Sequence, residues 1–380
     1  MAGNEQAVFK LHIIQADYGD CLLLEYGTAA DPGYILIDGG PASVYQTHLR
    51  QRLQAINAAG AKLDLAVLSH VDEDHIAGLL DFLSELQQQR ADGVAEPIAI
   101  GALWHNSFAG SLGADVEKRF RTLRQGTALR CALPTNTDLR ARSISQGDEL
   151  TQLATSLQIP LNPEFATHGL VCVDDAQPAI PLRNLRLSVV GPTQKNLQAL
   201  RKKWLKWLKE QEMQRTLPAV AYTPEALVKA DESVPNLSSI MLLAAAEGKT
   251  ILLTGDGRGD DLLRGLAQAN LLDTNGCLHV NVLKMPHHGS QRNVSKKFLA
   301  TITADTYIIC ANGKDDNPDL KTLQWIVETA KAQGRTVELI VTNPTDSTRQ
   351  LRMLDDPAVY GYQLLEMAPP ADLLTVDLVL

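Results

Sequence analysis

Ser69-His-Val-Asp-Glu-Asp-His75-Ile-Ala-Gly78 is the stretch that decides the fold of this 380-residue chain. It places two histidines and two aspartates within six residues, after an apolar run over 64–69 that predicts a buried strand. Apolar residues at helical spacing follow it. A turn from strand to helix lets such side chains converge, and imidazole nitrogens with carboxylate oxygens suit divalent ions. The stretch therefore predicts a metal site, although taken alone it fits a solvated acidic turn equally well.

Two distant segments repeat the arrangement of a strand that ends at a ligand-type residue. Thr250-Ile-Leu-Leu-Thr-Gly-Asp256 delivers an aspartate, and Asn281-Val-Leu-Lys-Met-Pro-His-His-Gly-Ser290 delivers His287 and His288. A lone aspartate or a lone histidine pair at a strand end is more often structural. Three such segments together favour a rigid scaffold that presents metal ligands along one edge.

The rest of the pattern predicts strands and helices in alternation. Apolar runs predict strands over 8–14, 22–26, 34–37, 98–104, 185–190, 240–245, 250–254, 280–283, 307–310 and 337–341. Helical spacing predicts helices over 43–59, 260–269 and 320–332. This mixture indicates a layered α/β architecture.

With these residues in view, the sequence resembles the metallo-β-lactamase superfamily, in the ComEC-like branch that includes the hydrolase domain of DNA-uptake proteins. Five segments carry the resemblance in the family's order: Tyr18-Gly-Asp-Cys21, Leu36-Ile-Asp-Gly-Gly40, Ser69 to Gly78, Leu253-Thr-Gly-Asp256 and Lys284 to Ser290. The resemblance implies an α/β fold, the αββα four-layer sandwich. We expect one hydrolase domain over 1–380, with 91–232 as an insertion or cap and 345–380 as a C-terminal extension.

The resemblance also implies two divalent metal ions, zinc or manganese. It assigns their ligands as His70 with Asp72 for the first ion, Asp74 with His75 for the second, Asp256 as the bridge, and His288 as the last histidine. His287 is the alternative for that last position, and the glycine that follows His288 favours His288. Asp38 matches an aspartate that braces the metal loop.

The sequence departs from the family pattern at two places. The central histidine ligand of many members is missing, because His105 and His168 do not follow the expected strand pattern and Pro235-Asn-Leu-Ser-Ser239 stands in its place. Harder oxygen ligands shift preference from zinc toward manganese or magnesium, so the metal stays open. Asn317 replaces a histidine that relatives often carry before a proline.

The function that these residues imply is phosphodiester hydrolysis, by a phosphodiesterase or nuclease that uses a hydroxide bridged between two metal ions. Asp74 would orient the nucleophile, and His287 would protonate the leaving oxygen if it is not a ligand. The candidates for contact with phosphate are Lys284, Asn236, Ser238, Ser290 and Asn312. A solvated lysine at a strand end explains Lys284 as well as contact with phosphate does. A simple turn before Gly313 explains Asn312 better than contact with phosphate does.

Two rival functions remain. The superfamily also includes hydrolases of lactone, amide and thioester substrates, although the missing central histidine and the ComEC-type motifs weigh against these. A non-catalytic interaction module with a vestigial site is the other rival, although nearly every ligand position is kept.

Composition limits the class of protein. The net charge of −9 argues against a surface that grips nucleic acid throughout, but leaves room for a local basic groove. Five scattered cysteines without a C-x-x-C pair fit a reducing compartment. Neither a signal peptide nor a transmembrane run is visible, so a cytoplasmic location is expected. The expected partner is a nucleic acid or nucleotide substrate, and a protein partner or homo-oligomer is possible.

One stretch has a charge that the metal site does not explain. Arg201-Lys-Lys-Trp-Leu-Lys-Trp-Leu-Lys209 is predicted to be helical and strongly basic. Such a helix can lie on nucleic acid, on a membrane surface or on a partner. We favour the plainer alternative, a helix that packs through its tryptophans with its lysines in water.

Overall fold

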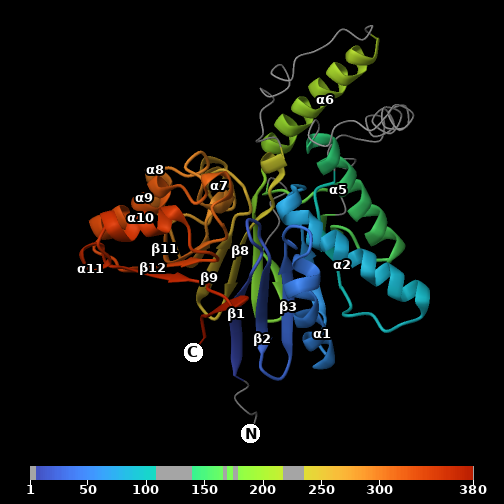
Figure 1. Cartoon of the computed structure of the whole chain (residues 1–380), viewed down its shortest axis with the longest axis horizontal. Helices are drawn as coiled ribbons and strands as arrows, with labels where there is room; N and C mark the ends of the chain where they lie inside the picture. Colours follow the sequence, from blue (N-terminus) through green and yellow to red (C-terminus); the bar gives the residue numbers. More distant parts are fainter. Residues whose placement is uncertain (1–5, 108–138, 166–168, 174–178, 217–234, 380) are drawn as a thin grey trace.

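Two β-sheets packed face to face form the centre of the computed structural model, which describes residues 6–107, 139–165, 169–173, 179–216 and 235–379 (Figure 1). The first sheet has six strands in the order β14-β1-β2-β3-β4-β5. These are β1 (Ala7–Ile14), β2 (Leu22–Thr28), β3 (Pro32–Ile37), β4 (Leu63–Val67), β5 (Leu103–Trp104) and β14 (Leu373–Asp377).

The second sheet has eight strands in the order β13-β12-β11-β10-β9-β8-β7-β6. These are β6 (Ile180–Leu182), β7 (Leu185–Gly191), β8 (Met241–Ala246), β9 (Lys249–Leu253), β10 (Leu278–Lys284), β11 (Ile302–Ile309), β12 (Val337–Val341) and β13 (Tyr362–Glu366).

Helices cover the outer face of each sheet. Over the first sheet lie η1 (Tyr45–Leu49), α1 (Arg50–Ala58), α2 (Glu73–Asp92) and α5 (Leu139–Ser156). Over the second lie α7 (Gly259–Gln268), α8 (Lys296–Thr301), α9 (Leu320–Ala332) and α10 (Asp346–Leu354), with α11 (Pro357–Tyr360) after them. The expected αββα four-layer architecture is confirmed.

This layering explains why the strands are apolar on both faces. Along β1, Phe9, Leu11 and Ile13 are buried in the core between the two sheets, whereas Ile14 is buried under the helices. A sheet that is covered on both sides has no face left for solvent, so alternation between apolar and polar residues disappears.

The strand directions fix where the polar loops meet. In the first sheet β3, β4 and β5 run parallel, and in the second sheet β9, β10, β11, β12 and β13 do so. The carboxyl ends of parallel strands share one edge. The loops after β3, β4, β9 and β10, which contain the motif residues, therefore gather at that edge.

Several elements differ from the sequence-based expectation. The helix expected over 43–59 begins as the π-helical η1 and becomes α1 only at Arg50, and the strand expected over 98–104 shortens to β5. Residues 345–380 supply the edge strand of each sheet, since β13 pairs with β12 and β14 pairs with β1. Among the described residues, none of the helices is long and apolar enough to cross a membrane.

Candidate metal centre

Asp38, directly after β3, holds the loop that carries the first histidine. Its Oδ1 accepts a hydrogen bond from the backbone N of Ser69 at 2.7 Å. Its Oδ2 accepts from Ser69 Oγ at 2.7 Å and from His75 Nδ1 at 2.8 Å. These three bonds tie the end of β4 and the start of α2 to one buried carboxylate, which is the bracing role expected for Asp38.

Two glycines let α2 approach that loop closely. The backbone N of Gly39 donates to His75 O at 2.8 Å, and the backbone N of Gly78 donates to Gly40 O at 2.9 Å. A Cβ atom at position 78 would overlap the carbonyl oxygen of Gly39. Close contact between two backbones therefore sets the position of the first turn of α2, where Asp74 and His75 lie.

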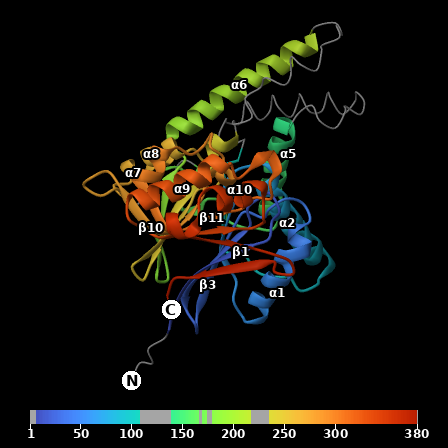
Figure 2. The ribbon, with the colours of Figure 1, turned by 60° about the vertical axis from the view of Figure 1, so that its left-hand side comes forward.

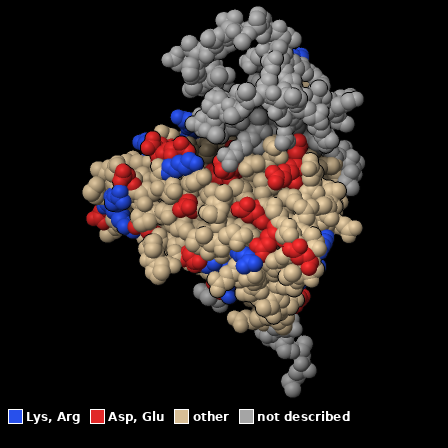
Figure 3. All heavy atoms as spheres, turned by 45° about the vertical axis from the view of Figure 1, so that its right-hand side comes forward, with Lys and Arg blue, Asp and Glu red and all other residues tan. Residues whose placement is uncertain are grey.

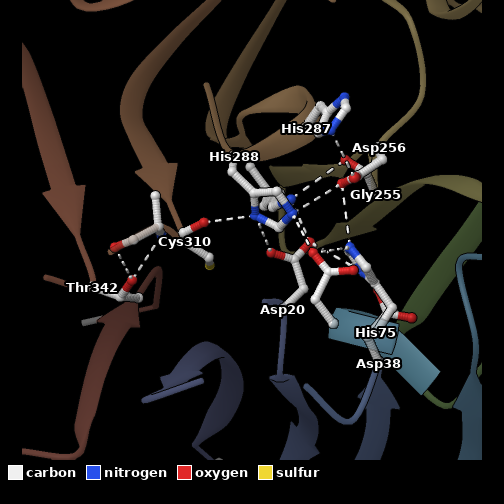
Figure 4. A network of polar contacts seen from close by, with 12 residues as sticks. Asp20, Asp38, His75, Gly255, Asp256, His287, His288, Cys310 and Thr342 are labelled. Atoms are coloured by element: carbon white, nitrogen blue, oxygen red, sulfur yellow. Dashed lines mark hydrogen bonds and ion pairs between the residues drawn. The ribbon is translucent and has the colours of Figure 1, made fainter. Parts of the chain in front are cut away.

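One oxygen of Asp256 faces a first group of ligand-type side chains (Figure 4). Oδ1 of Asp256 lies 3.4 Å from His75 Nε2 and 3.5 Å from His288 Nε2. Asp74 Oδ2 completes the group, 3.2 Å from His288 Nε2 and 3.8 Å from His75 Nε2. The ligand atoms of these four residues all lie within 4.8 Å of one another, which fits a metal ion.

The other oxygen of Asp256 faces a second group. Oδ2 lies 3.7 Å from His70 Nε2 and 3.6 Å from His287 Nε2. Asp72 Oδ2 is 3.5 Å from His70 Nε2. The Asp256 carboxylate thus stands between two groups, each with imidazole nitrogens and one further carboxylate.

All four imidazoles are held through Nδ1, which turns Nε2 toward Asp256. His75 Nδ1 donates to Asp38, and His288 Nδ1 donates to the carbonyl of Cys310 at 2.7 Å. His70 Nδ1 lies 3.1 Å from Ser69 Oγ. Metal-ligating histidines usually donate their second ring N–H to a carboxylate or carbonyl in this way, which leaves a lone pair on the other nitrogen.

His287 follows the same rule through Asn293. Its Nδ1 lies 3.0 Å from Asn293 Oδ1. The amide nitrogen of Asn293 donates to the carbonyl of Asp256 at 3.1 Å, so the amide oxygen is the atom that faces His287. His287 Nδ1 thus faces the amide oxygen of Asn293, and Nε2 is the ring nitrogen that faces Asp256.

Four of the atoms that face one another here lack a hydrogen-bond partner among the described residues. Among the described residues, Nε2 of His70, His75 and His288 and Oδ1 of Asp256 are buried without a hydrogen-bond partner. A buried polar atom without a partner costs about 1–3 kcal/mol. Three such nitrogens, together with an oxygen of the carboxylate that they face, fit the lone pairs of a metal-ligand set.

The electrostatics favour bound positive charge. Burial by itself lowers the pKa of His288, but Asp256 and Asp74 outweigh burial and raise that pKa to about 10. Burial raises the pKa of Asp256, but His288, His287 and His75 outweigh it and hold that pKa well below its usual range. The carboxylates are therefore ionised and attract protons or cations strongly.

Behind this cluster lies an ion pair that the sequence did not reveal. Lys284 is 1% exposed, forms an ion pair with Asp20, and donates to the carbonyl of Gly255 at 3.3 Å. Asp20 Oδ1 lies 3.6 Å from His288 Nδ1. Lys284 is thus on the inner side of the cluster, away from solvent. Asp20 had one signal in the sequence, its place in the Tyr18-to-Cys21 segment.

The four residues expected to contact substrate lie in different surroundings. Asn236, in η5 (Pro235–Ser238), has its amide nitrogen 3.3 Å from His287 Nδ1, and Ser238 is buried beside it. Ser290 is buried after the histidine pair, with its Oγ accepting from the backbone N of Arg292 at 3.4 Å. Asn312 is exposed and its Oδ1 accepts from the backbone N of Lys314, as a turn residue does.

The remaining histidines do not complete the cluster. His105 follows β5 directly, and its backbone N donates to Asn162 Oδ1 at 2.9 Å. Within the part of the chain that the structure describes, no ion pair or hydrogen bond joins His105 to Asp256. His168 lies outside the described residues, and Asn317 is buried in the loop that packs on Gly289.

Comparisons with known proteins agree with the fold. Residues 15–126 match the family model for the metallo-beta-lactamase superfamily, as the motifs predicted, and no comparison bears on the ComEC-like branch. A search among curated proteins gives no significant match.

Two solved structures are similar over most of their length. The metallo-beta-lactamase fold protein YhfI from Bacillus subtilis is 12% identical, with a TM-score of 0.40 over 97% of this chain and 99% of that one. A protein from Parabacteroides distasonis, described provisionally as a metal-dependent hydrolase, is 12% identical, with a TM-score of 0.38 over 88% and 98%. At these TM-scores neither likeness supports a conclusion about the function of this chain.

Proposed function

We propose that this chain, which has the metallo-β-lactamase fold, is a metal-dependent hydrolase whose substrates are phosphodiesters, with nucleic acids or nucleotides as the natural class. One observation carries the proposal. The two oxygens of the buried Asp256 carboxylate face two separate groups of ligand-type side chains. The order of the five motif segments supports a ComEC-like relationship as part of the same proposal.

The two groups suit two divalent ions. On the Oδ2 side of Asp256 the ligands are His70, Asp72 and His287, and on the Oδ1 side they are Asp74, His75 and His288. His287 thereby supplies the nitrogen that the missing central histidine would have given. Each side mixes imidazole with carboxylate, which suits zinc and manganese.

Divalent ions bound at such a pair of sites lower the pKa of a water molecule and offset the charge that develops on phosphate oxygens during in-line displacement. This chemistry suits phosphodiesters particularly well, because negative charge on both the attacking and the leaving oxygen has to be offset.

The side chains of the two groups differ in exposure to solvent, so the candidate centre has a closed side and an open side. The His70 and His75 side chains are 0% exposed and that of His288 is 5% exposed, whereas the side chains of Asp72, Asp74 and His287 are 29%, 23% and 32% exposed. Among the described residues of the two groups, Asp72, Asp74 and His287 thus mark the side from which substrate would approach. On that side Asp74 is placed to accept a hydrogen from the attacking water and so to orient it.

His287 acts as a ligand rather than as the acid in this proposal. Its Nδ1 lies 3.0 Å from Asn293 Oδ1 and its Nε2 lies 3.6 Å from Asp256 Oδ2, which is the arrangement that the other three imidazoles also have. Lys284 is a positioning residue, because its ammonium holds Asp20 beside His288 instead of facing the open side. Asn236, Ser238 and Ser290 are the residues we assign to phosphate contact, and Asn312 to its turn.

Metal analysis combined with a substrate panel tests the proposal. We expect bound zinc or manganese, hydrolysis of bis(p-nitrophenyl) phosphate, and little hydrolysis of lactone, amide or thioester substrates. Asp256→Asn keeps the shape of the side chain but removes the charge shared by both groups, so it should abolish hydrolysis and bound metal. Asp260→Asn, four residues along and exposed, is the matched control and should do neither.

The rival functions have distinct outcomes. Hydrolysis of acyl substrates without phosphodiesters would replace the proposal with an acyl hydrolase. Bound metal without any hydrolysis would favour a non-catalytic module. Protein that holds no metal at all after exposure to zinc and manganese would remove the basis of the proposal.

A further inference from the structure

The helix α6 (Gln194–Thr216) is anchored beside the candidate centre and extends away from it. Leu197 and Leu200 are buried in its first turns, which pack against η5. In η5, Asn236 reaches His287. Figures 1 and 2 show α6 leaving the molecule at the edge where the loops of the centre gather and extending beyond the body. The helix is thus an arm whose base packs on η5, the element that carries Asn236.

The arm has lysines along one face. Lys195, Lys202, Lys206 and Lys209 are separated by seven, four and three residues, which places them in one narrow stripe of an α-helix. All four are exposed, and Leu197 and Leu200 lie on the opposite face. At 1.5 Å per residue the stripe is about 21 Å long. We call these four residues the lysine stripe.

The stripe differs in charge from the rest of the molecule. Residues 194–209 contain six lysines and arginines and no acidic residue, in a chain of net charge −9. In Figure 3 acidic side chains are spread over the body of the face that it shows, with lysines and arginines in small separate groups. A run of charge of one sign attracts a polyanion.

We infer that the lysine stripe binds the phosphate backbone of a polynucleotide and leads the strand to the metal centre. The inference rests on the proposed function, because it names a polymeric substrate for the same site. Three features support it: the single sign of the charge, a length that spans several phosphates, and an attachment at η5, where Asn236 lies 3.3 Å from His287. A mononucleotide is too short to reach from the centre along the stripe.

Binding measured against salt tests the inference. We would compare Lys195→Gln/Lys202→Gln/Lys209→Gln with Lys249→Gln/Lys297→Gln/Lys321→Gln, which removes the same charge from three exposed lysines elsewhere. Both would carry Asp256→Asn so that no cleavage occurs. The probe is a labelled single-stranded oligonucleotide and a duplex of equal length. Loss of three phosphate contacts should flatten the slope of log K against log salt by about 2 and weaken binding at least about tenfold at low salt.

The outcomes separate this inference from the proposed function. Equal slopes for the two triple variants would overturn it, even where wild-type protein cleaves bis(p-nitrophenyl) phosphate. If the stripe variant loses binding to phosphatidylserine vesicles while its binding to both nucleic acids is unchanged, a membrane surface is the partner and the inference is wrong. If the stripe variant binds nucleic acid more weakly than the control variant, but the wild-type protein cleaves no phosphodiester, the inference holds and the proposed function is refuted.

Discussion

His287 and His288 both have left-handed backbone conformations, with φ of 47° and 54°. Such conformations cost about 1–3 kcal/mol each in a residue with a side chain, and persist only where the surroundings enforce them. Here the backbone N of His287 donates to Gly255 O, and His288 Nδ1 donates to Cys310 O. As a result of these conformations, the two adjacent residues direct their imidazoles toward different oxygens of Asp256.

This geometry predicts that the two histidines serve different ions. His287→Ala should weaken one metal equivalent at least about tenfold and leave the other bound, and His288→Ala should do the same to the other equivalent. Titration calorimetry with Zn²⁺ or Mn²⁺ measures both. If His287→Ala keeps two equivalents at full affinity and alters only the pH profile of hydrolysis, His287 is the acid and our ligand assignment is wrong.

Lys284 predicts a stability effect rather than a loss of substrate contact. Lys284→Met would leave the buried carboxylate of Asp20 without its cation, and breaking such a pair costs about 3–5 kcal/mol. Adding Asp20→Asn removes the stranded charge and should restore most of the stability in urea unfolding. A single variant as stable as wild type, with only a raised KM, would instead place Lys284 in contact with substrate.

For individual residues, the sequence reveals the candidate metal ligands but not the residues that hold them in position. His70, Asp74, His75 and Asp256 are visible because each follows an apolar run, so local pattern suffices to propose them. The ion pair of Asp20 with Lys284 joins residues that are far apart in sequence. No local pattern shows whether a lysine at the end of a strand turns inward.

Among the elements, α2 depends on one backbone contact. Gly78→Ala would press a methyl group against Gly39 O and push α2 away from the loop after β3. Because Asp74 and His75 lie in the first turn of α2, we expect both a loss of stability of about 1–3 kcal/mol and weaker metal binding. Thermal unfolding and metal titration measure the two effects.

Ser84→Ala, at an exposed position of the same helix, is the matched control and should change stability by less than about 0.5 kcal/mol. A Gly78→Ala variant that unfolds like this control would show that α2 can shift freely, against the close approach described above.

Helices with a strong hydrophobic period were predicted well, whereas a helix in which this period is weak was missed. The helix expected over 320–332 has those bounds as α9, because Leu323, Ile326, Val327 and Ala330 all lie on its buried face. Within the part of α5 whose side chains the structure describes, the buried apolar face begins at Leu150, and Gly147 precedes it. Packing against α2 supplies what local preference lacks there.

At the scale of the whole molecule, the C-terminal part of the chain passes from the second sheet to the first. β13 is the edge of the second sheet, and β14 then pairs with β1, the second strand of the first sheet. Long-range pairing of this kind has no signal in local sequence, which is why 345–380 was expected only as an extension. The candidate metal centre makes a second connection between the sheets, because Asp38 and His75 come from the first half and Asp256 and His288 from the second.

A centre that draws ligands from both sheets should stabilise the whole molecule when it binds metal. Binding to the folded state alone adds about 2.7 kcal/mol when free metal is a hundredfold above Kd. We therefore expect EDTA to lower Tm in differential scanning calorimetry and added Zn²⁺ or Mn²⁺ to restore it. Asp256→Asn should lower this response to metal because the carboxylate shared by the two groups is gone. A wild-type Tm that ignores both chelator and metal would mean that the two sheets are joined without the ions, and that the converging imidazoles serve another purpose.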